Sequence, residues 1–328
     1  MSTTPERMAR GRDPRVIVVG SVNIDMAVEV AALPKPGETV LGRDFRRSLG
    51  GKGANQATAA SRLGATTAII AAVGDDDEGR EAVAFLNEEG IDTAGVTFST
   101  GTRTGVALIC VDRHAQNQIV VAQGANATLD GPMVRRCLPA AAADSGNVVV
   151  LASLEIPLDA VIAASEVAAE RGWTLIVNPA PFQAMPYDLI RRVDVLTPNE
   201  IEAAALIGRD AWSDDQASID KLLDTGAKAV LVTLGAAGAL VLTEKTRTRI
   251  SAPPVAAVDA TGAGDVFNGA LAAELAFASC LHDAARVGVT AASIATTAHG
   301  ASTAPRRAQV LDSLGSDSTS CSDCRPVE

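Results

Sequence analysis

The stretch of the chain that could do chemistry is a short turn of small residues ending in a carboxylate. Gly262, Ala263 and Gly264 stand directly before Asp265, and an apolar helical pattern follows over residues 266–275. Such a turn leaves backbone N–H groups unpaired at the positive end of a helix dipole, which is a device for binding anions. Asp265 then either caps the helix, as aspartate often does, or does chemistry beside the anion.

Polar residues also follow five apolar, strand-like segments directly. In a mostly parallel sheet the carboxyl ends of the strands meet at one crevice, so these side chains are expected to converge there. The candidates are Asn23 and Asp25, Glu155, Asn178, Thr197 and Asn199, and Thr233 with Gly235.

A second glycine loop, GGKGANQ, opens an alanine-rich helical pattern over residues 50–65. It is a further candidate for binding an anion or a polar ligand. It is not a P-loop, because the chain contains no G-x-x-x-x-G-K-[ST] match. It is not a dinucleotide fingerprint either, since the segment before it, RRSL, is polar and amphipathic.

The elements that must position these residues are of two kinds. From residue 147 onward, buried apolar strands alternate with helices, which predicts β-α-β units, a mostly parallel sheet and an α/β fold. Residues 25–31 and 37–50, and a hairpin over 104–112 and 116–123, alternate apolar and polar side chains instead. This alternation predicts half-exposed strands in a separate small sheet.

Composition narrows the class of protein. The chain has 328 residues, 47% of them apolar, and a net charge of -11 without a cluster of basic residues, which argues against a nucleic-acid partner. No apolar run reaches the ~20 residues of a membrane span, and no secretory signal precedes the first strand, so a cytoplasmic protein is expected. Cys110, Cys137 and Cys280 have apolar neighbours in sequence and are expected to be reduced core thiols. Cys321 and Cys324 have metal or redox spacing but lie in a polar end that is expected to be disordered.

Nine motifs occur in an order that resembles the carbohydrate kinases of the phosphofructokinase-B type: SVNID, GGKGANQA, VGDDDEG, GANATL, LEIP, VNPAP, TPNEIE, TLGAAG and ATGAGDVFNGAL. The resemblance covers nearly the whole chain. It implies one kinase domain over residues 15–314, with disordered ends at 1–14 and 315–328. The implied fold is a three-layer α/β/α domain with a small four-stranded β lid. The implied reaction is transfer of phosphate from ATP to the 5-hydroxyl of D-ribose, giving ribose 5-phosphate and ADP.

The resemblance also implies roles for individual residues. The sugar ligands would be Asn23, Asp25, Gly51, Lys52, Asn55, Glu155 and Asp265. The nucleotide ligands would be Asn199, Thr233, Leu234, Gly235, Ala236, Ala237, Gly238, Gly264 and Asp265. Asn199 and Glu202, in N-x-x-E spacing, would organise the water shell of Mg²⁺; without the resemblance, Glu202 would be interpreted as a solvated acid in the first turn of a helix.

In this scheme the amides of residues 262–265 stabilise the transferring phosphoryl group, and Asp265 accepts the proton of the attacking hydroxyl. The helix dipole is expected to lower the pKa of Asp265. A K⁺ ion beside the loop would be bound by Asp259 and by carbonyls of Thr261, Ala295, Ala298 and Gly300. Ala304 stands where a hydroxyl ligand is usual, and Ser302 or Thr303 could substitute. His299 would lie near the adenine or in a solvated loop.

Three alternatives remain open at this point. The acceptor could be another furanose or a nucleoside, although 3% aromatic residues offer little lining for a nucleobase. The chain could also be a non-catalytic sugar sensor.

A homodimer is expected through the lid, because strands at 26–30 and 105–111 have no obvious cover and uncovered strand edges tend to be paired.

Overall fold

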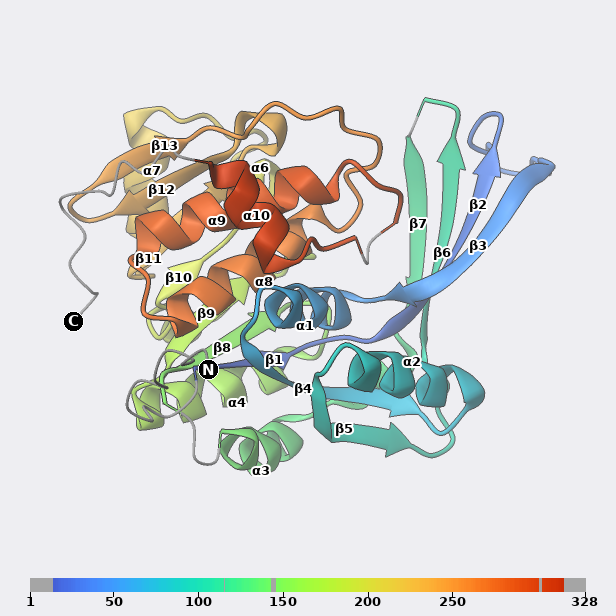
Figure 1. Cartoon of the computed structure of the whole chain (residues 1–328), viewed down its shortest axis with the longest axis horizontal. Helices are drawn as coiled ribbons and strands as arrows, with labels where there is room; N and C mark the ends of the chain where they lie inside the picture. The colour runs from blue at the N-terminus through green and yellow to red at the C-terminus, as the bar shows by residue number, and fades with distance from the viewer. Residues whose placement is uncertain (1–13, 115, 143–145, 301–302, 316–328) are drawn as a thin grey trace, which may run out of the picture.

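A central sheet and a smaller lid sheet make up the fold. The computed structural model describes residues 14–114, 116–142, 146–300 and 303–315. Figure 1 shows the lid sheet projecting from the main body, with helix α1 near its base. The expected disordered ends and the Cys321/Cys324 pair lie outside the described residues, apart from residues 14 and 315.

The central sheet has nine strands in the order β13-β12-β11-β10-β9-β8-β1-β4-β5. All neighbours are parallel except β11–β12 and β12–β13, so the expected mostly parallel sheet is confirmed. The strands are β1 (Arg15–Val19), β4 (Thr66–Gly74), β5 (Asp92–Ser99), β8 (Val148–Ser153), β9 (Thr174–Asn178), β10 (Val195–Leu196), β11 (Ala229–Thr233), β12 (Ala239–Thr243) and β13 (Arg247–Ile250).

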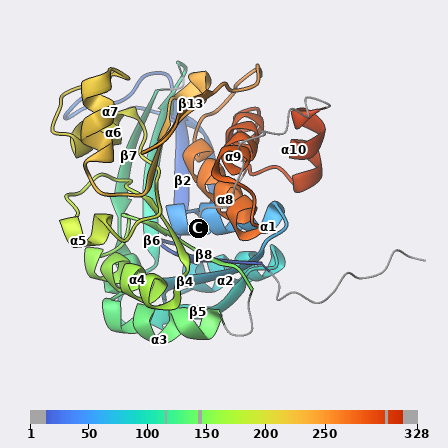
Figure 2. The ribbon, with the colours of Figure 1, turned by 90° about the vertical axis from the view of Figure 1, so that its left-hand side faces the viewer.

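Helices cover both faces of this sheet, and each face has its own apolar core. Val16 and Val18 of β1 point into one core and Ile17 and Val19 into the other, as strand alternation requires. The first core packs against α1 (Lys52–Arg62), α2 (Asp77–Glu88), α8 (Ala263–Ala276), α9 (Leu281–Ala295) and α10 (Arg307–Leu314). The second packs against α3 (Gly131–Ala141), α4 (Leu158–Arg171), α5 (Tyr187–Ile190), α6 (Glu200–Leu206) and α7 (Gln216–Leu223). Figure 2 shows the helices on either side of the sheet, confirming the three-layer α/β/α fold.

The lid has four strands in the order β3-β2-β6-β7. They are β2 (Asn23–Val30), β3 (Gly42–Gly50), β6 (Gly105–Asp112) and β7 (Asn117–Ala122). Residues 37–41, expected as strand, belong to the connection before β3. The expectation of free edges at 26–30 and 105–111 was wrong, because β2 and β6 pair with each other in parallel at the centre of the lid. The edges are β3 and β7, since each hairpin contributes one inner and one outer strand.

The structure can be compared with the expectations for the cysteines and for membrane-spanning segments. Cys110 and Cys137 are free, whereas Cys280 is disulfide-bonded. All three are half-buried, so the expectation of core thiols was wrong for each, and the expectation of a reduced thiol was wrong for Cys280. Apolar neighbours in sequence do not decide which way a side chain points. Within the described ranges, no helix is long and apolar enough to cross a membrane.

Candidate active site

A cavity of about 550 Å³ lies between the lid and the carboxyl ends of the central strands. Lid residues such as Ile109, Ile119 and Val121 supply apolar lining, and polar groups come from lid strands β2 and β7 as well as from the main body. A pocket that is apolar on one side and carries a few convergent polar groups is typical of small-molecule sites. All seven residues expected to bind a sugar line it: Asn23, Asp25, Gly51, Lys52, Asn55, Glu155 and Asp265.

Asp265 is the third residue of α8 and is only 6% exposed. Gly262 occupies the N-cap position with φ 75°, a left-handed conformation that favours glycine. The side chain of Asp265 does not cap the helix. Its Oδ2 accepts a hydrogen bond from Asn55 at 3.1 Å, and its Oδ1 accepts one from Gln56 at 3.0 Å. The capping alternative is therefore wrong, and the carboxylate is available to the cavity.

The turn before Asp265 presents backbone donors, although fewer than expected. The amide of Ala263 donates to the carbonyl of Ala260 at 3.2 Å. The amides of Gly264 and Asp265 donate to no acceptor within the described part of the chain. These two N–H groups lie at the positive end of the α8 dipole, so an anion can bind there.

The pKa of Asp265 is raised, contrary to the expected lowering by the helix dipole. Burial of the carboxylate is the main cause, and it outweighs the opposing effects of Lys52, Asn55 and Gln56. The same carboxylate is the main reason that the pKa of the Lys52 ammonium is raised, although burial opposes this. The pKa of Asp25 is raised to about 6, first by burial and then by Glu155 and Asp265. Asp265, Glu155 and Glu202 are the carboxylates that act on Lys52, whereas Asp25 is affected by two of these carboxylates and not by the lysine.

Two residues that sequence reasoning missed hold the sugar-side groups in place. The carboxylate of Glu155 accepts hydrogen bonds from the Lys52 amide at 3.0 Å and from the Ser21 hydroxyl. Asn126, directly after the lid, donates to the Asn23 carboxamide oxygen at 2.7 Å. Ser21 stands in the SVNID motif and Asn126 in GANATL, so their motif membership was the available signal.

Of the residues expected at the nucleotide, Asn199 and residues 233–238 lie together at the ends of β10 and β11, whereas Gly264 and Asp265 lie at the start of α8. Asn199 bridges to Thr233 and caps α6, and its side chain forms a reciprocal capping box with Glu202. Glu202 is 8% exposed, so its interpretation as a solvated acid was wrong. An exposed 3₁₀ turn is formed by Gly235, Ala236 and Ala237. The Leu234 amide before this turn donates a hydrogen bond to the Gly238 carbonyl after it, at 2.8 Å.

Asp259 joins the two loops that were expected to bind K⁺. Its Oδ1 accepts from the Thr261 amide and its Oδ2 from the Gly300 amide, both at 2.9 Å. Burial raises the pKa of Asp259, but these hydrogen bonds and nearby His299 outweigh it, so the net shift is downward and the group stays anionic. A carboxylate among backbone carbonyls is an oxygen-rich environment of the kind that hard cations prefer.

The other expected K⁺ ligands differ in whether their carbonyl oxygens already accept hydrogen bonds. Three of their carbonyls accept hydrogen bonds: Ala295 from the Ala298 amide at 3.3 Å, Gly300 from the Thr303 hydroxyl at 3.1 Å, and Ala304 from Arg62 at 2.9 Å. Ala304 is 5% exposed and ties the segment before α10 to α1. Ser302 lies outside the described residues.

His299 lines a second cavity of about 540 Å³, between the lid and the Asp259 loop. The imidazole is exposed there, beside Asp259 and Gly300. Within the described residues, no group of three or more His, Cys, Asp or Glu side chains has a geometry for holding a metal ion.

Comparison with known proteins identifies the family of the chain. The family model for the pfkB family carbohydrate kinases matches residues 13–308. The chain is 38% identical to a ribokinase of Haemophilus influenzae over 90% of this chain and 97% of the relative. It is similar to a ribokinase structure of Thermotoga maritima (TM-score 0.80, 33% identity, 91% and 98% of the two chains). It is also similar to an Arabidopsis thaliana ribokinase complexed with ribose and ATP (TM-score 0.82, 30% identity, 92% and 99%). The chain belongs to the pfkB family of carbohydrate kinases.

Proposed function

We propose that this protein transfers the terminal phosphoryl group of ATP to the 5-hydroxyl of D-ribose, producing ribose 5-phosphate and ADP. The observation that carries the proposal is the position of Asp265, which lies in the cavity beside the amides of Gly264 and Asp265, for which the described residues provide no acceptor. The similar proteins named ribokinase support the choice of acceptor.

The residues of the chain divide the reaction among them. Asn23, Asp25 and Asn55 bind sugar hydroxyls, because carboxylates and amides pair with vicinal donors and acceptors. Asp265 accepts the proton of the 5-hydroxyl as that oxygen bonds to phosphorus and the bond to ADP breaks. The amides of Gly264 and Asp265 stabilise charge on the transferring group. A loose phosphoryl-transfer transition state asks mainly for this orientation and charge stabilisation.

Two cations complete the proposal. Asn199 and Glu202 would hold the water shell of Mg²⁺, which neutralises phosphate charge when bound. Asp259 with the carbonyls of Thr261, Ala295, Ala298 and Gly300 would hold K⁺, which would strengthen the positive field at the phosphate loop. Ala304 offers no hydroxyl to this set, and its carbonyl, like those of Ala295 and Gly300, already accepts a hydrogen bond.

Release of ADP across a panel of acceptors tests the function. With Mg·ATP and K⁺, ribose is expected to give a kcat/KM at least about tenfold above those of deoxyribose, fructose and adenosine, because unpaired polar groups in the site penalise analogues lacking a hydroxyl. Replacing K⁺ with Na⁺ is expected to lower the rate. A better rate with adenosine would indicate a nucleoside kinase, and ribose-induced stabilisation without ADP would indicate a sugar sensor.

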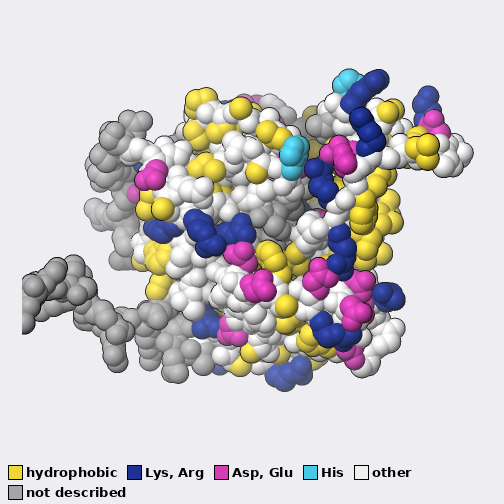
Figure 3. All heavy atoms as spheres, turned by 45° about the vertical axis from the view of Figure 1, so that its right-hand side comes forward, with side chains coloured by type: hydrophobic (Ala, Val, Ile, Leu, Met, Phe, Trp, Pro, Cys, Tyr) yellow, Lys and Arg dark blue, Asp and Glu magenta, His cyan; other side chains and the backbone are white. Residues whose placement is uncertain are grey.

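We also propose a homodimer through the lid. Cavity-lining Ala107, Ile109 and Val121 alternate with Leu108 and Val120, so the latter point to the opposite face, where they are 54% and 66% exposed. Phe45 is 63% exposed on edge strand β3, and Figure 3 shows hydrophobic side chains along the lid. An apolar face of this kind marks a protein contact.

Light scattering tests the dimer. The wild type is expected to have twice its 33.5 kDa mass at micromolar concentration, and Val120→Glu is expected to shift it to the monomer. Ile201→Glu, which replaces an exposed hydrophobic residue on α6, serves as the matched control. A monomeric wild type contradicts the proposal.

We place the protein in the cytoplasm, where ATP is available, and expect no nucleic-acid partner at a net charge of -11.

A further inference from the structure

Gln56 is a fully buried amide that does not line the cavity and yet touches Asp265. It follows Asn55 on α1 and is 0% exposed. Its Nε2 donates to Asp265 Oδ1 at 3.0 Å and to Asn178 Oδ1 at 3.4 Å. It is absent from the cavity wall, whereas Asn55 is part of it. Gln56 therefore acts on Asp265 from behind, on the side away from the acceptor.

The contact belongs to a buried chain of hydrogen bonds that returns to α8. Asn178 donates to the Thr197 carbonyl at 3.0 Å, and the Thr197 hydroxyl donates to Asn268 at 2.6 Å. Asn268 in turn donates to the carbonyl of Gly264, one residue before Asp265, at 2.8 Å. A connected polar network of this kind has few alternative arrangements in a low-dielectric interior. It ties α1, two strand ends and the start of α8 into one unit.

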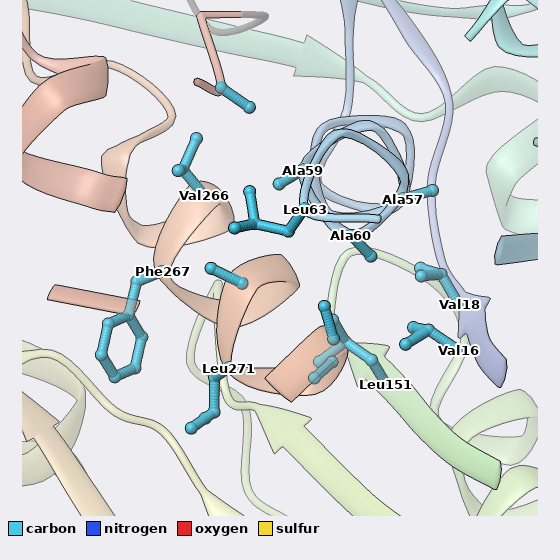
Figure 4. Packing of buried hydrophobic residues seen from close by; sticks show 14 of the residues in the cluster. Val16, Val18, Ala57, Ala59, Ala60, Leu63, Leu151, Val266, Phe267 and Leu271 are labelled. Carbon is cyan, nitrogen blue, oxygen red and sulfur yellow. The ribbon is translucent and has the colours of Figure 1, made fainter. Parts of the chain in front are cut away.

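Close packing fixes where Gln56 stands. A Cβ atom on Gly269 of α8 would lie 2.4 Å from the Gln56 carbonyl oxygen and 2.6 Å from the Ala59 Cβ, so the two helices touch at this glycine. Figure 4 shows the apolar packing of the same two helices, with Ala59 and Leu63 of α1 facing Val266 of α8. The backbone of Gln56 is thereby held against the helix that carries Asp265.

Packing alone does not call for an amide at this position. The Oε1 atom of Gln56 is buried and accepts no hydrogen bond from the described residues. An unpaired buried acceptor is unfavourable, and methionine would fill a similar volume without one. What glutamine supplies here is its N–H donors, one of which Asp265 uses.

We propose that Gln56 is a positioning residue for the proposed phosphoryl transfer. It fixes the rotation of the Asp265 carboxylate by holding Oδ1, and this leaves Oδ2, on the Asn55 side, to accept the hydroxyl proton. Such orientation matters because a misplacement of about 1 Å can cost roughly 100-fold in rate. The inference rests on the role of Asp265 in the proposed function.

Donation by Gln56 also favours the ionised carboxylate, so its loss should leave a signature in the pH profile. The charged groups that act on Asp265 are Lys52 of α1, Glu155 after β8, Asp25 of β2 and Glu202 of α6. None of these is altered when Gln56 is replaced. Removing the donor raises the pKa of Asp265 further, and the acid limb of the kcat profile moves to higher pH.

Gln56→Met is the main test. We expect kcat to fall about 10- to 100-fold, the KM values for ribose and ATP to stay within about threefold, and the acid limb to move upward in pH. Thr58→Val is the matched control, because Thr58 is buried on α1 two residues on, which places it on a different face of the helix. It is expected to keep the kcat and pH profile of the wild type.

A second readout separates this inference from the choice of acceptor. In protein labelled with ¹³C at aspartate carboxyls, the signal lost in Asp265→Asn identifies Asp265, and its titration is expected at higher pH in Gln56→Met. If ribose is not phosphorylated but this shift occurs, the proposed function fails and the carboxylate contact stands. An unshifted Asp265 titration overturns the inference, as does a wild-type kcat. If Gln56→Met does not fold, Asn178→Ala removes the support of Gln56 without touching Asp265, and it is expected to shift the titration in the same direction by less.

Discussion

Asp265→Asn is expected to lower kcat for ribose about 10²- to 10⁴-fold, the usual contribution of a general base. Asparagine keeps the shape of the side chain but has only one oxygen, so it cannot accept the hydroxyl proton or both amide hydrogen bonds from Asn55 and Gln56. The fold should survive, because burial already disfavours the ionised carboxylate. Steady-state ADP release at saturating ribose and ATP measures the first effect, and thermal unfolding followed by circular dichroism measures the second.

Asp283→Asn provides the matched control. Asp283 is the third residue of α9, as Asp265 is of α8, so both carboxylates lie at the same place in a helix dipole. Asp283 is outside the cavity, and its replacement should leave kcat unchanged. If Asp265→Asn keeps more than about a third of the wild-type kcat while remaining folded, Asp265 is not the base.

Local patterns in the sequence were sufficient to predict the layers of the fold but not the order of the lid strands. The apolar run 16–19 and its counterparts predicted buried parallel strands, because both faces of such strands must be apolar. The hairpin over 104–112 and 116–123 and the strands at 25–31 and 37–50 were visible from their alternation. Their mutual arrangement was not, since Met26 pairs with both Arg47 and Leu108 across neighbouring strands and nothing local to Met26 specifies either partner.

Asn23, Asp25 and Glu155 could be predicted because sites form at the carboxyl ends of strands, whereas the other strand-end candidates, Asn178, Thr197, Asn199, Thr233 and Gly235, do not line the cavity. The order of the motifs supplied Gly51, Lys52, Asn55 and Asp265. The expectations about the site that failed were those that depended on the burial of a side chain. The pKa of Asp265 moves upward because of the surroundings that cover it, and no spacing in the chain reveals them. Gln56 lies in GGKGANQ, but the sequence predicts no role for it, because a glutamine at the start of an alanine-rich helix does not differ in pattern from a solvent-facing one. Its importance depends on contacts with residues about 120 and 210 positions away.

Asp25→Asn is expected to make the protein more stable at neutral pH and less able to use ribose. The carboxyl titrates at about 6 in the folded chain and near 3.8 unfolded. Between these values the folded state binds more protons than the unfolded state, so the stability contributed by this group falls as pH rises through the window. At pH 7 the ionised group therefore costs ~1–3 kcal/mol, which asparagine removes. Near pH 4 the variant and wild type should converge, and urea unfolding at the two pH values tests this.

The same replacement exchanges a carboxylate for an amide, and sugar hydroxyls donate stronger hydrogen bonds to a charged carboxylate than to a neutral amide oxygen. We expect kcat/KM for ribose to fall ~10- to 100-fold, mainly through KM, because a hydrogen bond to a charged group contributes about 1.5–3 kcal/mol. Asp44→Asn, on exposed strand β3 of the lid, should change neither stability nor kcat/KM. A variant that gains stability and keeps its KM would mean that Asp25 does not bind the acceptor. One that loses both would mean that the carboxylate supports the lid. The expected opposition between stability and binding arises because Asp25, Glu155 and Asp265 are crowded around one cavity to meet a polar ligand, at an electrostatic cost to the unliganded fold.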